Sequence, residues 1–372
     1  MTRKYDIPLA RPFVTRAEVE AVVSVLRTPR LSMGPKVPEF ENALADYCGT
    51  KHAVACSSGT AGLHMIVRAM GIGGGDEVIT TPFSFVASSN CILMEDATPV
   101  FVDIDPDTWN IDPNKIEAAI TSRTRAVLAV DAFGPVAEMD AIRAIADGHD
   151  LRVIEDSCEA LGTVCNGCRA GSLGDAGVFG FYPNKQITTG EGGMVVTSDG
   201  DLVDRCRSLR NQGRSSGGWL AHPRMGYNYR MSDINAALGL TQLSRIDEII
   251  KERTRVRSLY FERLADESRI ELQKMRGDQD VSWFVFVVRL ADQYATQDRN
   301  RILSSLCEMG IGCSNYFAPI HLQPFYRERF GFKPGDFPIC EAVANRTIAL
   351  PFHHELTGDN IDVICTELCK LL

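Results

Sequence analysis

The sequence has no long apolar run and no cluster of basic residues. No stretch of its 372 residues approaches the roughly 18 apolar residues that a membrane-spanning helix requires. The N-terminal stretch MTRKYDIPLARPF is basic, but no apolar segment follows it, which argues against a secretory signal. The net charge is −9, and no basic surface able to follow a phosphate backbone is indicated. We therefore expect a cytoplasmic protein that binds neither a membrane nor nucleic acid.

Motifs for several common cofactors are also missing. No GxGxxG follows the first predicted strand, and no GxxxxGK[ST] occurs. Cys165 and Cys168 form a lone CxxC around Asn-Gly, a dipeptide typical of a tight hairpin turn. No second pair lies at zinc-site spacing. We expect a reduced hairpin pair there and no metal site.

What is present is an alternation of β and α patterns over the first two-thirds of the chain. Helices are predicted over GTAGLHMIVRAMG, NKIEAAITS and EMDAIRAIADGHD, between β-rich runs such as RAVLAVDAF and LRVIEDS. Strands that are apolar on both faces indicate a mostly parallel sheet covered by helices. We predict an α/β fold with a three-layer αβα large domain, whose ligands bind beyond the carboxyl ends of the strands.

The remaining pattern predicts a second unit. DAGVFGFYP and GGMVVTSD form a hairpin-like pair, and a long helical stretch then begins with Ser232 as its N-cap. We predict a large domain over residues 1–250 and a smaller C-terminal α+β domain over residues 251–372. The N-terminal segment can pack on the small domain in this scheme.

Two candidate features contain small or aromatic residues. SSGTAGL opens a helix, where backbone N–H groups and the helix dipole can face an anion, and Thr60 adds a hydroxyl. The alternative is an ordinary N-cap. Phe85, in TTPFSF, lies just past a strand end and can stack on a flat ring. The alternative is a core phenylalanine.

Two further features are charged. Asp156 ends an apolar strand, where it is either satisfied by N–H groups or paired with a cation. Lys185 lies in the bend FGFYPNKQITTGEGG, residues 179–193, among Pro, Asn, Thr and Gly. A lysine in a partly dry pocket can have a lowered pKa and attack a carbonyl as a free amine. The alternative is a solvated turn lysine.

These four features together fit one cofactor, pyridoxal phosphate. It needs an anion cradle, a stacking face, an acid on the pyridine nitrogen and a lysine that forms a Schiff base. Asp156 would keep the ring nitrogen protonated, so that the ring accepts electrons when a C–H bond breaks.

The ordered motifs resemble the sugar aminotransferases of the DegT/DnrJ/EryC1/StrS family. They include SSGTAGL, TPFSFVASSN, EDSCEALG, GSLGDAGVFGFYPNKQITTGEGG, GYNYRMSDINAALGLTQL and PIHLQPFYR, and they cover nearly the whole chain. The resemblance implies the aspartate aminotransferase fold (fold type I) and pyridoxal phosphate as the cofactor.

The resemblance also implies a role for particular residues. Lys185 would form the Schiff base and move the proton, and Asp156 would pair with the pyridinium. Phe85 would stack on the ring. The phosphate would be bound by Gly59, Thr60 and Ala61. Asn228 matches a position that reaches the phosphate of the neighbouring subunit, which implies a homodimer with shared active sites.

Two positions depart from the family pattern. Members often have Ser five residues before the lysine, where this chain has Gly180. Members often have Gln or His three residues after the aspartate, where this chain has Glu159. A glutamate beside the phenolate oxygen would be repelled unless protonated; it would raise the pKa of the lysine-linked nitrogen, or point elsewhere.

The reaction implied is the transfer of an amino group to a nucleotide-linked keto-sugar, with L-glutamate as the donor. The family suggests a 4-keto-6-deoxy hexose first and a 3-keto sugar second; the nucleotide and the pathway stay open. Lys36 and Arg230 are candidate substrate contacts. His321 either touches sugar or diphosphate or packs in the core.

Two other functions are weighed against this one. Dehydratases of the same family typically carry His where Lys185 stands, so the sequence argues against that activity. A cofactor-binding sensor or partner subunit without turnover is the other alternative. The Lys185–Asp156 pair and the absence of a DNA-binding segment weigh against it.

Overall fold

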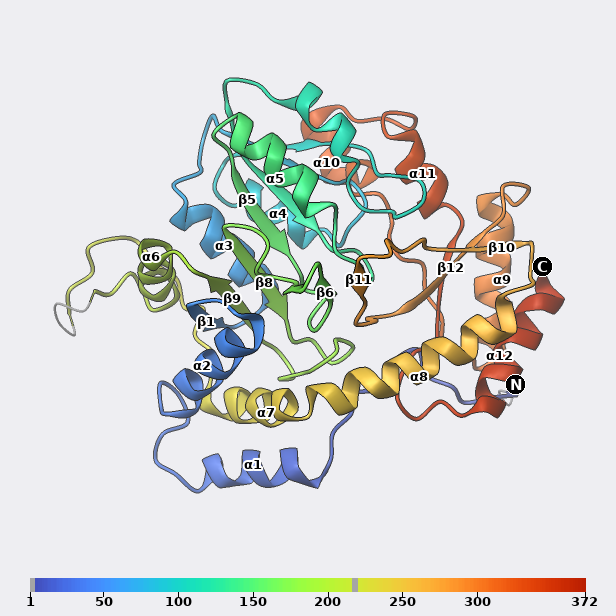
Figure 1. Ribbon diagram of the computed structural model, residues 1–372, viewed down its shortest axis with the longest axis horizontal. Coiled ribbons are helices and arrows are strands. Elements are labelled where there is room, and N and C mark those ends of the chain that lie inside the picture. Colours follow the sequence, from blue (N-terminus) through green and yellow to red (C-terminus); the bar gives the residue numbers. More distant parts are fainter. Residues whose placement is uncertain (1–3, 216–219) are drawn as a thin grey trace.

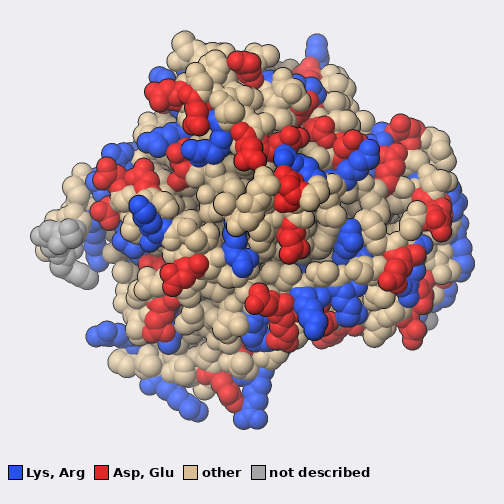
Figure 2. Space-filling model, viewed as in Figure 1, with Lys and Arg blue, Asp and Glu red and all other residues tan. Residues whose placement is uncertain are grey.

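The computed structural model describes residues 4–215 and 220–372. Figure 1 shows a large body around one central sheet and a smaller body beside both termini, with helix α8 (Ile246–Leu264) running between them. On the face that Figure 2 shows, positive and negative side chains are interspersed. No helix in the described ranges has the length and apolar character needed to cross a membrane.

The central sheet has seven strands in the order β1-β9-β8-β5-β4-β2-β3. Strands β8, β5, β4, β2 and β3 pair with one another in parallel. Strand β9 runs antiparallel to both β1 and β8. The mostly parallel sheet and the hairpin-like β8–β9 pair are therefore confirmed. The strand bounds are β1 (His52–Cys56), β2 (Glu77–Thr80), β3 (Thr98–Phe101), β4 (Thr124–Val130), β5 (Arg152–Asp156), β8 (Ala176–Gly180) and β9 (Gly193–Thr197).

Helices cover both faces of this sheet because successive strand residues point to opposite sides. In β1, Val54 and Cys56 pack into one core cluster, while Ala53 and Ala55 pack into another. The first face is covered by α3 (Gly59–Ala69), α4 (Ala87–Leu93) and α6 (Gly200–Arg210). The second is covered by α2 (Lys36–Cys48), α5 (Met139–Gly148) and α7 (Asp233–Ser244), with α1 (Arg16–Leu26) outside α7. The predicted αβα layering is confirmed.

One predicted helix is wrong. NKIEAAITS forms two 3₁₀ turns, η1 (Pro113–Lys115) and η2 (Glu117–Ala119). Ile116 is the fully buried side chain of this segment, and Ala119 and Ile120 are half-buried against the same core cluster. The backbone then becomes extended at Ile120, which ends the second turn.

The long helical stretch is two helices rather than one. Ser232 caps α7 as predicted, accepting a hydrogen bond from the backbone N–H of Asn235 at 3.2 Å. The chain leaves helical geometry at Arg245, where φ is −113°, and α8 follows. The side chain of Arg245 bonds Glu18 of α1 at 2.6 Å, so tertiary contacts hold the junction.

The CxxC segment is the expected hairpin. Strands β6 (Val164–Cys165) and β7 (Cys168–Arg169) pair antiparallel across Asn166 and Gly167, and β11 (Gln279–Asp280) joins β6 on its other edge. The two turn residues have φ of 49° and 79°, which is the backbone that an Asn-Gly turn adopts.

The smaller body packs helices on a second sheet. This sheet has the order β10-β12-β13 and shares a core cluster with α8 and two more helices. The elements are β10 (Ile270–Leu272), β12 (Phe286–Leu290), β13 (Thr347–Leu350), α9 (Thr296–Met309) and α12 (Gly358–Leu371). The N-terminal segment lies against it, since the backbone N–H of Tyr5 donates to the carbonyl of Met309 at 2.8 Å.

Part of the chain after residue 251 packs on the large body instead. The elements concerned are η3 (Ile320–Leu322), α10 (Pro324–Phe330) and α11 (Pro338–Ala344). The Tyr326 hydroxyl donates to Ser89 at 2.7 Å, and the Cys340 N–H donates to Asp103 at 2.8 Å. The domain division at residue 250 falls inside α8 and stays a prediction.

A buried histidine of the smaller body predicts a pH-dependent stability. His353 is 5% exposed, and burial lowers its pKa from 6.5 to about 4. The folded protein therefore binds fewer protons than the unfolded chain between these values, so the free energy of unfolding falls as pH decreases from 6.5 to about 4. We expect His353→Gln to remove roughly 2 kcal/mol of this decrease, measured by urea unfolding across the pH range. Parallel curves for the two proteins would contradict it.

Candidate active site

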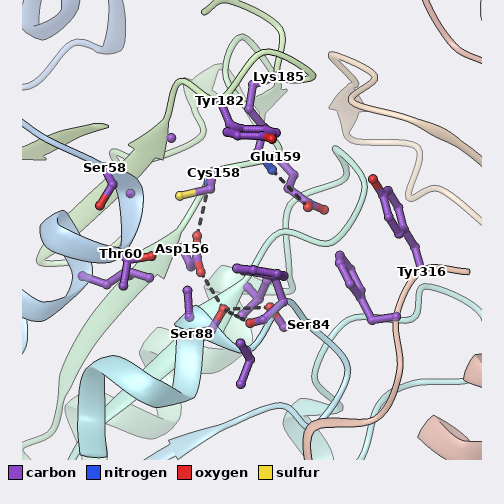
Figure 3. Close-up of a pocket in the computed structure, with 18 of the residues that line it drawn as sticks. Ser58, Thr60, Ser84, Ser88, Asp156, Cys158, Glu159, Tyr182, Lys185 and Tyr316 are labelled. Carbon is purple, nitrogen blue, oxygen red and sulfur yellow. Dashed lines mark hydrogen bonds and ion pairs between the residues drawn. The ribbon is translucent and has the colours of Figure 1, made fainter. Parts of the chain in front are cut away.

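A cavity of about 770 Å³ opens beyond the carboxyl ends of the parallel strands. Its walls come from the loops after β1, β2, β5 and β8, and from the smaller body through Phe284 and the segment 315–318. Figure 3 shows Ser58, Thr60, Asp156, Glu159 and Lys185 around it. Four of the strand-end features predicted from the sequence therefore meet in one place, as the sheet topology requires.

The N-terminus of α3 forms one end of the cavity. Gly59 and Thr60 line it, together with Ser58, which the sequence analysis did not single out. Ser58 is the N-cap, and its hydroxyl accepts the N–H of Ala61 at 3.1 Å. Ala61 is buried and does not line the cavity, and the Ser58 hydroxyl already satisfies its N–H. The remaining first-turn N–H groups and the helix dipole suit a phosphate at this end.

Asp156 lies on the cavity floor with both carboxylate oxygens occupied. The Ser88 hydroxyl donates to Oδ2 at 2.7 Å, and the Cys158 N–H donates to Oδ1 at 3.2 Å. Ser84 shares a hydrogen bond with Ser88 at 2.7 Å, which orients Ser88 (Figure 3). Neither serine was predicted from the sequence, although both lie in the serine-rich run that follows strand β2.

Lys185 extends into the cavity from the turn after β8. Its Nζ lies 3.2 Å from Oε1 of Glu159 and 3.9 Å from the ring centre of Phe284. The turn is fixed from behind, because the buried guanidinium of Arg253 donates to the carbonyls of Asn184 and Lys185 at 3.1 and 3.0 Å. A lysine in this bend therefore reaches inward from a held backbone.

Glu159 does not point away from the site. Oε2 accepts the N–H of Phe133 at 2.9 Å, and Oε1 faces Lys185. Burial raises the pKa of Glu159, while the charge of Lys185 lowers it. The departure from the family pattern thus places a carboxylate directly beside the lysine nitrogen.

Aromatic side chains complete the walls. Phe85 lines the cavity and is 63% exposed, so one ring face is free for a ligand. Tyr182, Tyr316 and Phe325 also line it and were not predicted. The aromatic-rich segments FYPNK and SNYFAPIHLQPFYR carried that signal.

Three predicted site residues lie outside the cavity of their own chain. Asn228 forms a backbone bridge with Asn211, and Arg230 donates to the Asn211 side chain at 3.0 Å. Lys36 pairs with Glu39 at 2.5 Å. The first turn of α2, which begins at Lys36, is linked to the start of α7, because the Lys36 N–H donates to Asp233 at 2.8 Å. None of the three residues is among those that line the cavity.

His321 does not line the cavity either. It is fully buried, its Nε2 lies 3.0 Å from Glu341, and its ring packs edge-on against Phe337. Burial lowers its pKa. Its position fits the packing alternative, since no face of the imidazole is open to a sugar or a diphosphate.

Gly180 is explained by its neighbour Cys158. A Cβ at position 180 would lie 3.3 Å from the Cys158 sulfur, and a Cβ at Gly59 would lie 2.8 Å from the same atom. The thiol therefore occupies the space between the two glycines. The serine hydroxyl that family members often carry at this position would be crowded here.

This crowding predicts a compensating pair. We expect Gly180→Ser to lower stability by about 1–3 kcal/mol, because the added side chain presses on Cys158. Adding Cys158→Ala to Gly180→Ser should restore most of that loss, whereas Cys158→Ala alone leaves a small void and destabilises slightly. Thermal unfolding of the four proteins measures the coupling. Additive effects would show that the sulfur does not exclude the side chain.

Two of the solved structures that resemble this chain are described as aminotransferases. PseC from Helicobacter pylori, an aminotransferase involved in the biosynthesis of pseudoaminic acid, superposes with a TM-score of 0.94 at 29% identity, over 99% of each chain. The PLP-form of the putative sugar aminotransferase Spr1654 from Streptococcus pneumoniae superposes with a TM-score of 0.93 at 30% identity, over 99% of this chain and 100% of that one.

Sequence relatives agree with the structural neighbours. GDP-perosamine synthase from Caulobacter vibrioides is 40% identical over 368 residues, covering 98% of both chains. The spore coat polysaccharide biosynthesis protein SpsC from Bacillus subtilis is 38% identical over 371 residues, covering 97% of this chain and 95% of the relative. The profile of the DegT/DnrJ/EryC1/StrS aminotransferase family matches residues 13–369. The chain is therefore a member of the DegT/DnrJ/EryC1/StrS aminotransferase family, as its ordered motifs indicated.

Proposed function

We propose that this protein is a pyridoxal-phosphate-dependent aminotransferase that moves an amino group from L-glutamate to a keto group of a nucleotide-linked 6-deoxy keto-sugar. The observation that carries the proposal is the cavity that holds Lys185, Asp156 and the N-terminus of α3 together. The relative named GDP-perosamine synthase supports a nucleotide-linked acceptor, and SpsC supports a role in polysaccharide biosynthesis.

The residues present fit the cofactor. When bound, pyridoxal phosphate supplies an aldehyde that reacts with amines and a ring that accepts electrons. Asp156, held by Ser88 and the Cys158 N–H, presents a carboxylate that would keep a proton on the ring nitrogen. The first turn of α3 would hold the phosphate, and Phe85 would cover one ring face.

Lys185 has two tasks in this proposal. Its amine would be the covalent attachment point, and once released it would move a proton between two carbons of the reacting system. Both tasks require a nitrogen that is held in place and shielded from water. The Arg253 contacts to the turn and the Phe284 ring over Nζ support this.

The charges of the cavity indicate that one chain does not complete the site. Among the cavity residues in the described parts of the chain, Lys185 carries the one positive charge, against Asp156, Glu159 and Glu191. The cofactor phosphate, L-glutamate and a sugar nucleotide are all anions, so further cations or amide donors are needed.

A second copy of the chain would supply these groups. Asn228, Arg230 and Lys36 lie outside their own cavity on segments joined through the start of α7. A homodimer in which these segments face the partner's cavity would share its two active sites. The keto position, C-4 or C-3, and the nucleotide are left to a screen of keto-sugar nucleotides with L-glutamate as donor.

The donor half-reaction tests the lysine assignment. We expect purified protein loaded with cofactor to convert it to the pyridoxamine form on addition of L-glutamate, with release of 2-oxoglutarate. Lys185→Ala should slow this conversion about 100- to 10,000-fold, because the proton-moving amine is gone. Lys251→Ala, at an exposed position of α8, is the matched control. Full activity in Lys185→Ala would refute the assignment, and no conversion in the wild type would favour a silent cofactor-binding protein.

Mixing two inactive variants tests the shared site. Lys185→Ala and Asn228→Ala each damage both sites of their own dimers. A mixed dimer has one site with both residues intact, so random reassortment should recover about a quarter of the wild-type activity. The mixture is unfolded and refolded together and then assayed against each variant alone. Mixtures no more active than the average of the two variants would rule out the shared site.

A further inference from the structure

Three carboxylates line the cavity, and the two buried ones, Asp156 and Glu159, are held differently. Asp156 accepts hydrogen bonds from Ser88 and from the Cys158 N–H, which satisfy both of its oxygens. Glu159 accepts the Phe133 N–H with Oε2 alone, and its other oxygen faces Lys185. Glu159 is therefore the carboxylate in direct contact with the amine (Figure 3).

The contact is nearly removed from water. The side chains of Lys185 and Glu159 are 15% and 9% exposed, and the nitrogen and oxygen are 3.2 Å apart. Solvent screens charges weakly at such a site, so each charge strongly affects the protonation of the other.

Burial and pairing compete at Glu159. Burial raises the pKa of the carboxyl group, whereas the ammonium of Lys185 and the Phe133 N–H lower it by favouring the carboxylate. The geometry favours the charged form, because each oxygen already faces a donor. Both donors stabilise the ionised carboxylate more than the neutral acid.

We propose that the Glu159 carboxylate stabilises a positive charge on the Lys185 nitrogen, both in the free side chain and after attachment to the cofactor. The second half of this statement rests on the proposed function. A glutamine at this position, as in many family members, would leave the nitrogen without that counter-charge.

The consequence is chemical. A positive charge on the Lys185 nitrogen withdraws electrons from a carbon bonded to it, so an incoming amine attacks that carbon more readily. Glu159 would extend this activation to higher pH than an uncharged neighbour would.

Other titratable groups surround the pair, and among them Asp156 carries a negative charge whose oxygens accept from Ser88 and the Cys158 N–H. Burial raises the pKa of the Cys158 thiol and of the Tyr316 phenol, so both stay neutral near pH 7. Arg253 contacts the backbone of the turn from the side of α8. The titratable and charged groups that face the pair come from four places in the fold. They are Asp156 and Cys158 at the end of β5, Tyr182 in the lysine turn, Tyr316 before η3, and Arg253 on α8.

The test measures the amine itself in cofactor-free full-length protein. Acetic anhydride acylates only the unprotonated amine, so labelling of Lys185, measured by peptide mass spectrometry across a pH series, gives the midpoint of its deprotonation. We expect Glu159→Gln to move this midpoint about one to two pH units lower, because the opposite charge is removed. Glu191→Gln removes an equal charge at an exposed position of the cavity rim and should move it far less.

A second variant and a second readout guard against a folding defect. Glu159→Asp keeps the charge but withdraws it by one methylene, so its midpoint should lie between those of the wild type and Glu159→Gln. In cofactor-loaded protein, the pH midpoint of the visible absorbance should move in the same direction as in the labelling series.

Equal midpoints in the wild type and both Glu159 variants would overturn the proposal, and so would a shift to higher pH. The labelling uses neither cofactor nor substrate. Its outcome is therefore distinguishable from a failure of the aminotransferase assignment.

Discussion

The buried guanidinium of Arg253 holds the turn from which Lys185 extends into the cavity. It lies on α8, is 7% exposed, and donates to the backbone carbonyls of Asn184 and Lys185. Burial lowers its pKa to about 10, so it stays charged at neutral pH. Because α8 packs on both bodies, the lysine turn is tied to the helix that joins them.

The same constraint explains why both bodies contribute to the cavity. The strand ends of the large sheet supply Asp156, Glu159 and Lys185, and the smaller body supplies Phe284 beneath the lysine nitrogen. A lysine on an exposed surface turn would have neither these neighbouring side chains nor this shielding from water. Here its reach, its neighbours and its shielding are all set by packing.

Neighbouring side chains also account for the two departures from the family pattern. Gly180 accompanies a cysteine sulfur that fills the space between two glycines. Glu159 accompanies a backbone N–H that holds one of its oxygens and a lysine that faces the other. Both departures therefore belong to local sets of contacts: one fills the space beside the first turn of α3, and the other places a carboxylate beside the amine.

Local patterns in the sequence were enough for the α/β class, the β8–β9 hairpin, the Asn-Gly turn and the Ser232 cap, because each follows from periodicity or from the chemistry of a few adjacent residues. They were also enough to select Lys185, Asp156, Thr60 and Phe85, since residues at the carboxyl ends of parallel strands converge. The helix expected over NKIEAAITS was wrong because the backbone becomes extended at Ile120, which the local apolar pattern did not reveal.

Tertiary structure decided the rest, since contacts between residues far apart in the chain leave no local pattern. It places Ser88 beside Asp156, and Arg253 beside the turn that carries Lys185. It also buries His321 against Glu341 and places Glu159 beside the Lys185 amine. It leaves Asn228, Arg230 and Lys36 outside the cavity that their own chain forms: the Tyr229 carbonyl accepts the Ser57 N–H just beyond β1, and the Lys36 N–H donates to Asp233 at the start of α7.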